Sequence, residues 1–269
     1  MDFLTLTFVF IFGTIIGSFL NVVIYRYNSG TSPLTGRSHC FSCGKVLTPR
    51  DLIPLISFLI SGGRCAMCKV RLSWQYPIVE ALTGFMFVAV FLLNKSALET
   101  TILLFIFSTL IVIAVYDLRH QIIPDGLAAL FAVLGLTQFF LKVPTFALAF
   151  HNPYYWTLIA GPMLFFPFWA LWFVSQGRWL GLGDGKLALG IGWFLGATLG
   201  GSAIMLAFWI GAVYALVVMG AQKVMHKRKH ILTLQSEIPF GPFLILAVFI
   251  VYFTGVNFFD GSINFFTFV

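Results

Sequence analysis

The chain has 269 residues, of which 59% are hydrophobic and only 9% are charged, and its mean hydropathy is +0.97. A chain with this few polar residues cannot cover the surface of a water-soluble protein of its length. The composition therefore excludes a soluble globular fold and predicts an integral membrane protein. The formal net charge is +7. The basic residues lie between apolar runs, where orientation in the bilayer explains them, so membrane lipids are expected as partners and nucleic acid is not.

Eight apolar runs are predicted to be transmembrane helices, because about 20 helical residues cross the roughly 30 Å of bilayer hydrocarbon. The first run lacks a basic start and a small-residue cleavage site, so we expect it to be retained and not removed as a signal peptide. Two later runs, 77–93 and 186–199, are short or contain glycine, which leaves open a re-entrant helix. The predicted fold is therefore an all-α integral membrane protein with about eight transmembrane helices, at residues 3–25, 77–93, 100–117, 126–142, 156–175, 186–199, 202–221 and 239–258.

The basic residues orient the chain and divide it into three parts. Lys and Arg of short loops stay on the cytoplasmic side of a membrane. Of the 16 basic residues, 14 lie in the segments 26–76, 118–124, 177–186 and 222–237. We therefore predict a first transmembrane helix at 1–25, a small cytoplasmic domain at 26–76 and a transmembrane core at 77–269, with both termini outside the cytoplasm.

All four cysteines lie in the segment 26–76, in two C-x-x-C pairs that are separated by 21 residues. This spacing is typical of zinc ribbons, in which each pair supplies two thiolates to one tetrahedral ion. A segment this short cannot build a sufficient core by itself, so a structural Zn²⁺ ion is expected to supply folding energy and to do no catalysis. Disulfides or redox dithiols are the alternative, which a reducing cytosol disfavours. The predicted ligands are Cys40, Cys43, Cys65 and Cys68.

Three aspartates lie at the cytoplasmic ends of predicted transmembrane helices, where ionisable groups are costly and usually functional. Asp117 ends the third helix, and its alternative role is to reach toward water and pair with Arg119. Asp184 begins the sixth helix in a Gly-x-Gly-Asp sequence, where capping of the helix N-terminus is the alternative. Asp125 follows Pro124 and is predicted to be an ordinary N-cap.

Asp117 and Asp184 are the candidate catalytic residues. Two carboxyl groups held close together in a low-dielectric site cannot both ionise easily, so they share one proton. The ionised group can then activate a water molecule while the protonated group polarises a peptide carbonyl, which is the chemistry of aspartyl peptidases.

Several motifs, in order along nearly the whole chain, resemble the type IV prepilin peptidase family, which are bacterial membrane aspartyl proteases of the Gly-x-Gly-Asp type. They are GSFLNVVIYR at 17–26, the two cysteine pairs, YPIVE at 76–80, the 117–125 segment, GLGDGK at 181–186 and EIPFGP at 237–242. The resemblance implies that prepilins or pseudopilins are cleaved at the cytoplasmic face of the bacterial inner membrane, after a glycine that precedes their hydrophobic helix. It places Asp117 and Asp184 at the family's two catalytic positions.

The resemblance also implies a second activity. Members with the cysteine domain commonly N-methylate the newly exposed residue, often phenylalanine, with S-adenosylmethionine as the methyl donor. Because both cysteine pairs are present, we expect a bifunctional peptidase and N-methyltransferase. No donor-binding residues and no oligomeric state follow from the sequence, and Gly62-Gly63-Arg64 beside the second cysteine pair is predicted to be a turn.

Three other functions stay open. A presenilin-type or signal-peptide-peptidase-type protease also uses Gly-x-Gly-Asp, but that class has Pro-Ala-Leu in place of Ile-Pro-Phe-Gly-Pro and has no cysteine domain. An ion-coupled transporter would use Asp117 and Asp184 as proton relays, although such groups more often lie near mid-bilayer between inverted repeats. A non-catalytic zinc-ribbon assembly factor would tolerate the loss of either aspartate.

Overall fold

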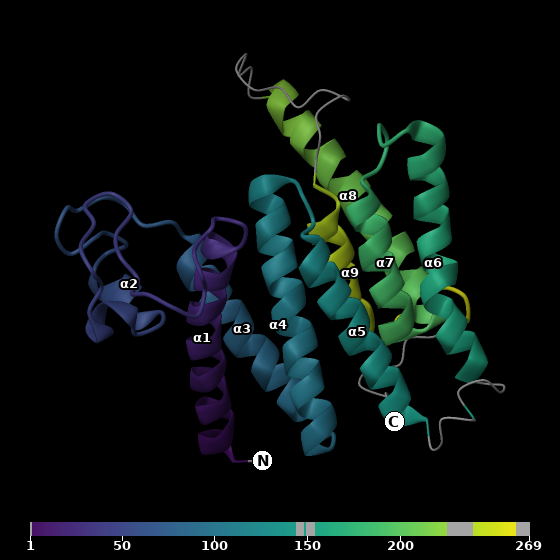
Figure 1. Cartoon of the computed structure of the whole chain (residues 1–269), viewed down its shortest axis with the longest axis horizontal. Coiled ribbons are helices and arrows are strands. Elements are labelled where there is room, and N and C mark those ends of the chain that lie inside the picture. The colour runs from purple at the N-terminus through teal and green to yellow at the C-terminus, as the bar shows by residue number, and fades with distance from the viewer. Residues whose placement is uncertain (1, 144–147, 149–153, 225–238, 262–269) are drawn as a thin grey trace. The chain divides into compact units, whose positions relative to one another are not determined.

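The computed structural model describes residues 2–143, 148, 154–224 and 239–261, and within these residues it is helical and has no β-strand (Figure 1). A helix lies at each of the eight predicted positions, which confirms the all-α fold. A 3-10 helix, η1 (Pro49–Leu52), and a short helix, α2 (Ile56–Ile60), lie in the segment 26–76, which we call the cysteine segment. The eight helices are α1 (Phe3–Arg26), α3 (Gln75–Leu92), α4 (Ala97–His120), α5 (Asp125–Lys142), α6 (Tyr154–Ser175), α7 (Leu182–Leu195), α8 (Ala197–Val224) and α9 (Gly241–Thr254).

The chain forms two compact units, Met1–Val112 and Ile113–Val269, and α4 continues from the first into the second. The first unit contains α1, the cysteine segment and α3, and the second contains α5 to α9 with the end of α4. The division into 1–25, 26–76 and 77–269 stays a prediction. Residues 225–238, which include most of the basic segment 222–237 and Glu237 and Ile238 of the last motif, lie outside the described residues.

Six of the eight helices are long and apolar enough to cross a membrane: α1, α3, α4, α5, α6 and α8. The other two, α7 and α9, have 14 residues each. At ~1.5 Å per residue each is about 21 Å long, shorter than the bilayer hydrocarbon. Both end at a glycine with positive φ, Gly196 at 82° and Gly255 at 62°. Gly196 therefore separates α7 from α8, and the predicted extension of the sixth helix to residue 199 was wrong.

Small residues let α1 and α3 pack closely in the first unit. A Cβ atom added at Gly17 would lie 2.7 Å from the Cα of Glu80, and one added at Gly13 would lie 2.9 Å from the Cα of Gly84. Gly13 and Gly17 are four residues apart, so both face α3. This is the small-x-x-x-small arrangement by which membrane helices bring their backbones together.

A polar network joins the C-terminal part of α1 to the start of α3. The Nδ2 of Asn21 donates a hydrogen bond to the carbonyl oxygen of Tyr76 at 3.2 Å, and the Nε2 of Gln75 donates to the Oδ1 of Asn21 at 3.3 Å. The Tyr25 ring stacks on the Tyr76 ring with centroids 5.3 Å apart. The structure therefore brings the 17–26 and 76–80 motifs together.

Two further contacts tie the cysteine segment to this helix pair. The Glu80 side chain on α3 is buried, and its Oε2 accepts a hydrogen bond from the backbone N–H of Leu55 at 2.8 Å. The guanidinium of Arg26, the last residue of α1, donates to the carbonyl oxygen of Thr35 at 2.7 Å. The segment is thus held by the end of α1 and by the first turns of α3.

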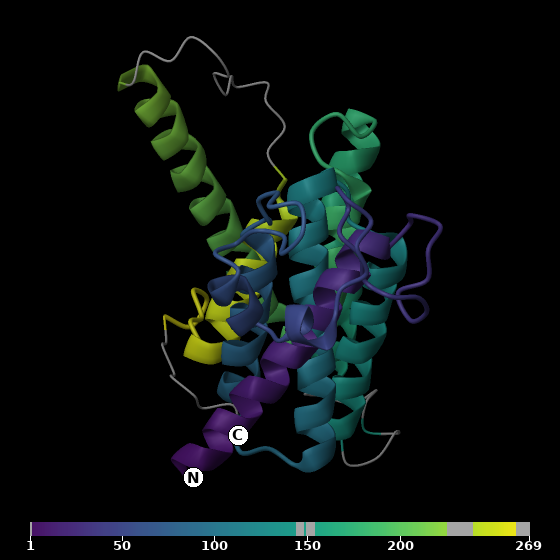
Figure 2. The ribbon, with the colours of Figure 1, turned by 90° about the vertical axis from the view of Figure 1, so that its left-hand side faces the viewer.

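The central helix of the second unit is α7, against which α5, α6, α8 and α9 pack. A Cβ atom at Gly190 of α7 would lie 2.5 Å from the Cδ1 of Phe131 on α5, so only glycine fits there. The indole N–H of Trp193 donates to the carbonyl oxygen of Leu158 on α6 at 2.9 Å. The neighbouring helices therefore enclose α7, whereas Figure 2 shows α8 diverging from α6 toward its C-terminal end.

The α1–α3 contact predicts a stability cost for a larger residue at position 17. In Gly17→Leu the new side chain would occupy the space of the Glu80 backbone, and overpacking of this kind costs about 1–3 kcal/mol. We expect the Tm of the protein purified in detergent to fall by several degrees. The control is Ile15→Phe, which enlarges an exposed side chain of the same helix. Equal Tm values for the two variants would contradict the close contact.

Candidate active site and metal centre

Asp117 and Asp184 come together in the second unit although 67 positions separate them. Asp117 lies about one turn before the end of α4, and Asp184 lies in the first turn of α7. The two residues are only 4% and 9% exposed, and their carboxyl groups are close enough to interact electrostatically. A carboxylate that reached toward water would be exposed, so the burial of Asp117 argues against that alternative.

Two glycines permit the backbone to approach this pair. A Cβ atom on Gly241, the first residue of α9, would lie 2.6 Å from the Oδ2 of Asp117. The backbone N–H of Gly241 donates a hydrogen bond to that carboxylate. Ile123 contacts both glycines, since an added Cβ would lie 2.9 Å from its Cβ at Gly183 and 3.2 Å from its Cδ1 at Gly241. Side chains at positions 183 and 241 would therefore displace Ile123 or Asp117.

An ion pair lies at the same helix ends. The Oδ1 of Asp125 is 2.6 Å from the Nζ of Lys186 on α7, and the Asp125 side chain is largely exposed. Asp125 is the first residue inside α5 and Pro124 is the N-cap, so the predicted N-cap role of Asp125 was wrong. From this position the carboxylate points outward and reaches the lysine. Asp184 is not an N-cap either, because Gly181 holds that position in α7.

Four helix ends meet around the aspartates: the C-terminus of α4 and the N-termini of α5, α7 and α9 (Figure 1). The exposed ion pair places this end of the unit next to solvent. Two buried carboxyl groups that interact electrostatically favour a state in which they hold one proton between them. The arrangement can therefore supply an ionised and a protonated carboxyl group side by side, close to water.

The four cysteine sulfur atoms form one cluster in the first unit, in which all lie within 4.8 Å of one another. The Sγ atoms of Cys40 and Cys68 are 3.9 Å apart. Tetrahedral zinc, with Zn–S bonds of about 2.3 Å, places its sulfur ligands about 3.8 Å apart. In a disulfide the two sulfur atoms would be only about 2.05 Å apart. The cluster therefore fits a single zinc ion and not a pair of disulfides, and it leaves no ligand position for water.

The backbone of each cysteine pair favours the thiolate form of its first cysteine. The N–H groups of Cys68 and Met67 donate to the Cys65 sulfur and lower the pKa of that thiol to about 6. The N–H of Cys43 likewise lowers the pKa of Cys40. Since the thiolate is the form that binds metal, these turns prepare two of the four ligands.

Gly241, Ile123 and Lys186 are site residues to which the sequence analysis gave no role. The dipeptide Gly241-Pro242 is typical of a helix start. It could therefore have predicted free backbone N–H donors at this point of the chain. The contact of Ile123 with two glycines far away in the chain has no local signal. It depends on how α7 and α9 pack.

Two protein families match this chain. Residues 11–93 match the Bacterial Peptidase A24 N-terminal domain, and residues 104–216 match the Type IV leader peptidase family. The first match includes all four cysteines, and the second includes both buried aspartates. The two matches are consistent with the two compact units.

Curated relatives extend the similarity to nearly the whole chain. The chain is 31% identical to the Prepilin leader peptidase/N-methyltransferase of Bacillus subtilis (strain 168), over 97% of each protein. It is 30% identical to the Type 4 prepilin-like proteins leader peptide-processing enzyme of Escherichia coli O78:H11, over 87% of this chain and 88% of that one. A Prepilin leader peptidase/N-methyltransferase of Aeromonas hydrophila is 29% identical over 92% and 90%. No solved structure matches the chain significantly.

The sulfur cluster predicts the metal content of the purified protein. We expect about one zinc ion per wild-type chain, and loss of most of it in Cys40→Ser and in Cys65→Ser, because three thiolates hold zinc less tightly. Inductively coupled plasma mass spectrometry measures the zinc. Ser42→Ala is the control, since it changes a residue of the first pair that supplies no sulfur. An unchanged zinc content in both cysteine variants would rule out the four-thiolate site.

Proposed function

Because the chain belongs to the type IV leader peptidase family, we propose that it cleaves the leader peptides of type IV prepilins or pseudopilins and N-methylates the residue that cleavage exposes. The observation that carries this proposal is that the Asp117 and Asp184 carboxyl groups are both buried and interact electrostatically within one compact unit. The names of the relatives support both activities. Which bacterial pilus or secretion system the protein serves depends on which pilin it cleaves.

Asp117 and Asp184 are the proposed catalytic residues. The ionised carboxylate takes a proton from the attacking water, and the protonated carboxyl group donates a hydrogen bond to the carbonyl oxygen of the scissile peptide. The tetrahedral intermediate then collapses, the C–N bond breaks, and a proton passes to the leaving nitrogen. The N–H of Gly241 holds the Asp117 carboxylate in position for these steps.

The proposed active site faces the cytoplasm at the inner membrane. Seven basic residues in the segment 26–76 favour a cytoplasmic location for that segment. The aspartates lie at helix ends and not at mid-helix. A pilin's apolar helix can therefore lie in the bilayer against the transmembrane helices, with its leader junction at the membrane surface where water is present.

Zinc and S-adenosylmethionine are the proposed cofactors. Zinc, bound by Cys40, Cys43, Cys65 and Cys68, would fix the fold of a segment that has little core of its own. S-adenosylmethionine, when bound, supplies the methyl group that the new N-terminal amine accepts. The names of the relatives as N-methyltransferases support this donor.

The family assignment favours this peptidase over the functions that the sequence left open. Nothing in the comparisons supports an ion-coupled transporter, and the helix-end aspartates agree with a site for a peptide at the membrane surface. The match at 11–93, with its cysteine pairs, favours this family over presenilin-type proteases. A zinc-ribbon assembly factor would have no need of two buried acids that interact electrostatically.

The aspartate pair predicts two inactive variants. Asp117→Asn and Asp184→Asn each remove the shared proton, and we expect kcat/KM for leader cleavage to fall on the order of 10³-fold. The assay follows a purified prepilin in detergent by mass spectrometry. Wild-type activity should be bell-shaped against pH, because one carboxyl group must be ionised and the other protonated.

The matched control for these variants is Glu99→Gln, which removes a negative charge in the first turn of α4, the end opposite to Asp117. We expect it to cleave like the wild type. Methylation of a synthetic mature pilin N-terminus should persist in both aspartate variants. Cleavage at the wild-type rate by either variant would eliminate the pair as the catalytic group.

The approach of Gly241 to Asp117 predicts a second loss of activity. In Gly241→Ala the new methyl group would lie 2.6 Å from the Oδ2 of Asp117, so the carboxylate must move. We expect kcat/KM to fall about tenfold or more, since small misplacements of catalytic groups are costly. Gly220→Ala is the control, because an added Cβ there has nothing within 4 Å. Equal activity of the two variants would contradict the proposed positioning role.

A further inference from the structure

The cysteine segment exposes an apolar stretch, LIPLISFLI at 52–60, that the proposed function does not use. Three side chains of α2 in this stretch, Ile56, Leu59 and Ile60, are 53%, 74% and 83% exposed. Water-soluble domains seldom expose such neighbouring large apolar side chains without a partner. An apolar environment next to α2 would cover them.

The contacts of α2 tie it to the start of a helix that is long and apolar enough to cross a membrane. Leu55, which precedes α2, is held by Glu80, five residues into the transmembrane helix α3. Five residues correspond to about 8 Å along a helix. Trp74, at the start of α3, is exposed, and tryptophan is enriched where membrane meets water. Figure 1 shows α2 below the upper end of α1 and not beyond it. The exposed face of α2 is therefore at the depth of the lipid headgroups and upper acyl chains.

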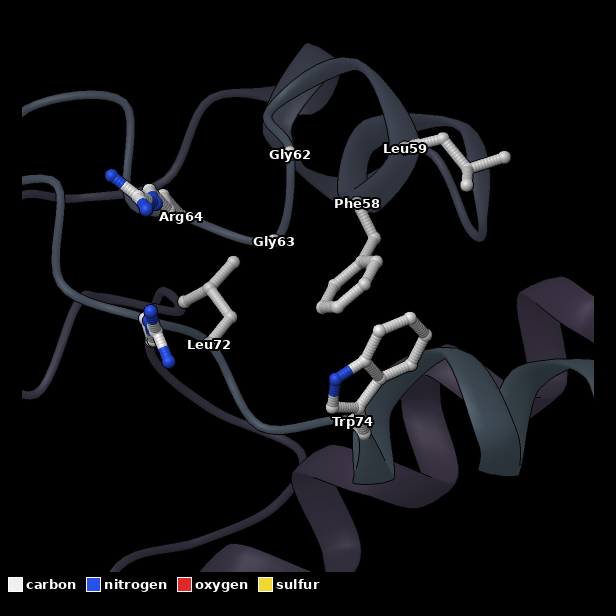
Figure 3. A pocket seen from close by; sticks show the side chains of 8 residues that line it. Phe58, Leu59, Gly62, Gly63, Arg64, Leu72 and Trp74 are labelled. Carbon is white, nitrogen blue, oxygen red and sulfur yellow. The ribbon is translucent and has the colours of Figure 1, made fainter.

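A pocket of about 530 Å³ opens beside α2. Phe58 and Trp74 face each other on one side of it, with ring centroids 5.1 Å apart, and Arg64 lies on the opposite side beyond Leu72 (Figure 3). The turn predicted at 62–64 closes it, with Gly62 and Gly63 at φ 60° and 66°. The volume lies within the range of small-ligand sites.

Two exposed residues of like charge line this pocket. Arg64 and Arg71 both line it, and they are opposite each other in an isolated antiparallel bridge. Side chains of directly opposite residues lie on the same face, and like charges there repel each other. The equivalent bridge of the first cysteine pair joins His39 to Val46, so the turn itself does not require two arginines. No acidic residue lines the pocket, and neither arginine forms an ion pair among the described residues. A bound anion would remove the repulsion.

We propose that the Arg64/Arg71 pocket binds the phosphate of an anionic phospholipid headgroup, and that α2 inserts its apolar side chains beside the acyl chains of the same lipid layer. Arginine binds phosphate through two parallel hydrogen bonds, and two guanidinium groups together match a phosphodiester. The combination of inserted apolar side chains and a basic site is what holds a peripheral segment stably at a membrane. The bound lipid would fix the cysteine segment at the membrane surface.

Charge decides between this lipid and the methyl donor as the occupant. S-adenosylmethionine carries a sulfonium, an ammonium and a carboxylate group, so its net charge is positive, which two guanidinium groups disfavour. The pocket offers no carboxylate to bind either cationic group. A headgroup with a net negative charge therefore fits this pocket better than the donor does.

The test uses the full chain, purified in detergent and freed of lipid. Binding of dioctanoyl phosphatidylglycerol is measured by native mass spectrometry for the wild type, Arg64→Gln/Arg71→Gln and Arg71→Gln. We expect saturable binding to the wild type, roughly thirtyfold weaker binding to the double variant and about fivefold weaker binding to the single variant, as for basic groups at an anionic membrane surface.

The control variant is Arg37→Gln/Arg50→Gln, which removes the same charge from exposed positions of the same segment and should bind like the wild type. Zinc content and Tm report whether each variant is folded. If the double variant is not folded, the lipid affinity of Arg71→Gln tests the proposal. Leu59→Ser/Ile60→Ser should also weaken lipid binding, because it removes the inserted side chains.

Four results would overturn the proposal. They are equal affinity of the arginine variants and the wild type, equal affinity for dioctanoyl phosphatidylcholine, displacement of the lipid by inorganic phosphate at a similar concentration, and binding of S-adenosylmethionine that the arginine variants lose. The third would indicate a soluble anion, and the fourth would make the pocket the donor site. All four are independent of leader cleavage.

Discussion

The electrostatic interaction between two buried carboxyl groups is the constraint around which the second unit is arranged. Removing Asp117 and Asp184 from water is unfavourable, and their mutual repulsion adds to this when both are charged. The N–H of Gly241 compensates in part, and one proton held between the two groups would remove the repulsion. Glycine at positions 183 and 241 lets α7 and α9 approach Ile123 and the aspartates without a gap. The catalytic proposal depends on this close approach.

The first unit solves a different physical problem, because its extramembrane segment has little core. Metal ligation by four cysteines, a buried carboxylate that holds Leu55, and a guanidinium that holds the loop after α1 take the place of apolar burial. The Gly13/Gly17 contact fixes α1 against α3, to which those anchors attach. Apolar side chains that would form the core of a soluble domain are turned outward on α2, where a membrane can cover them.

Short helices show where sequence patterns were informative and where they were not. Hydropathy located all eight helices, because an apolar run of this length has few other structures in a membrane. Hydropathy predicted that the sixth helix ends at residue 199, whereas α7 ends at Leu195. The sequence does not distinguish Gly196 from the other glycines nearby, and only its positive φ shows that the helix ends there. Hydropathy also predicted a spanning helix at 239–258 and left open a re-entrant helix at 186–199, whereas α7 and α9, with 14 residues each, need neighbours that enclose them.

By itself, the sequence determined the membrane location, the four-sulfur set and the two acids, because composition and residue spacing along one chain carry that information. Only the tertiary structure decided that Asp117 meets Asp184, that Asp125 pairs with Lys186 and not with its own helix, and that Arg64 lies opposite Arg71 beside an exposed α2. The physical reason is that these are contacts between distant segments. Their geometry is set by how closely glycines let helices and turns pack, and no local pattern of residues encodes that distance.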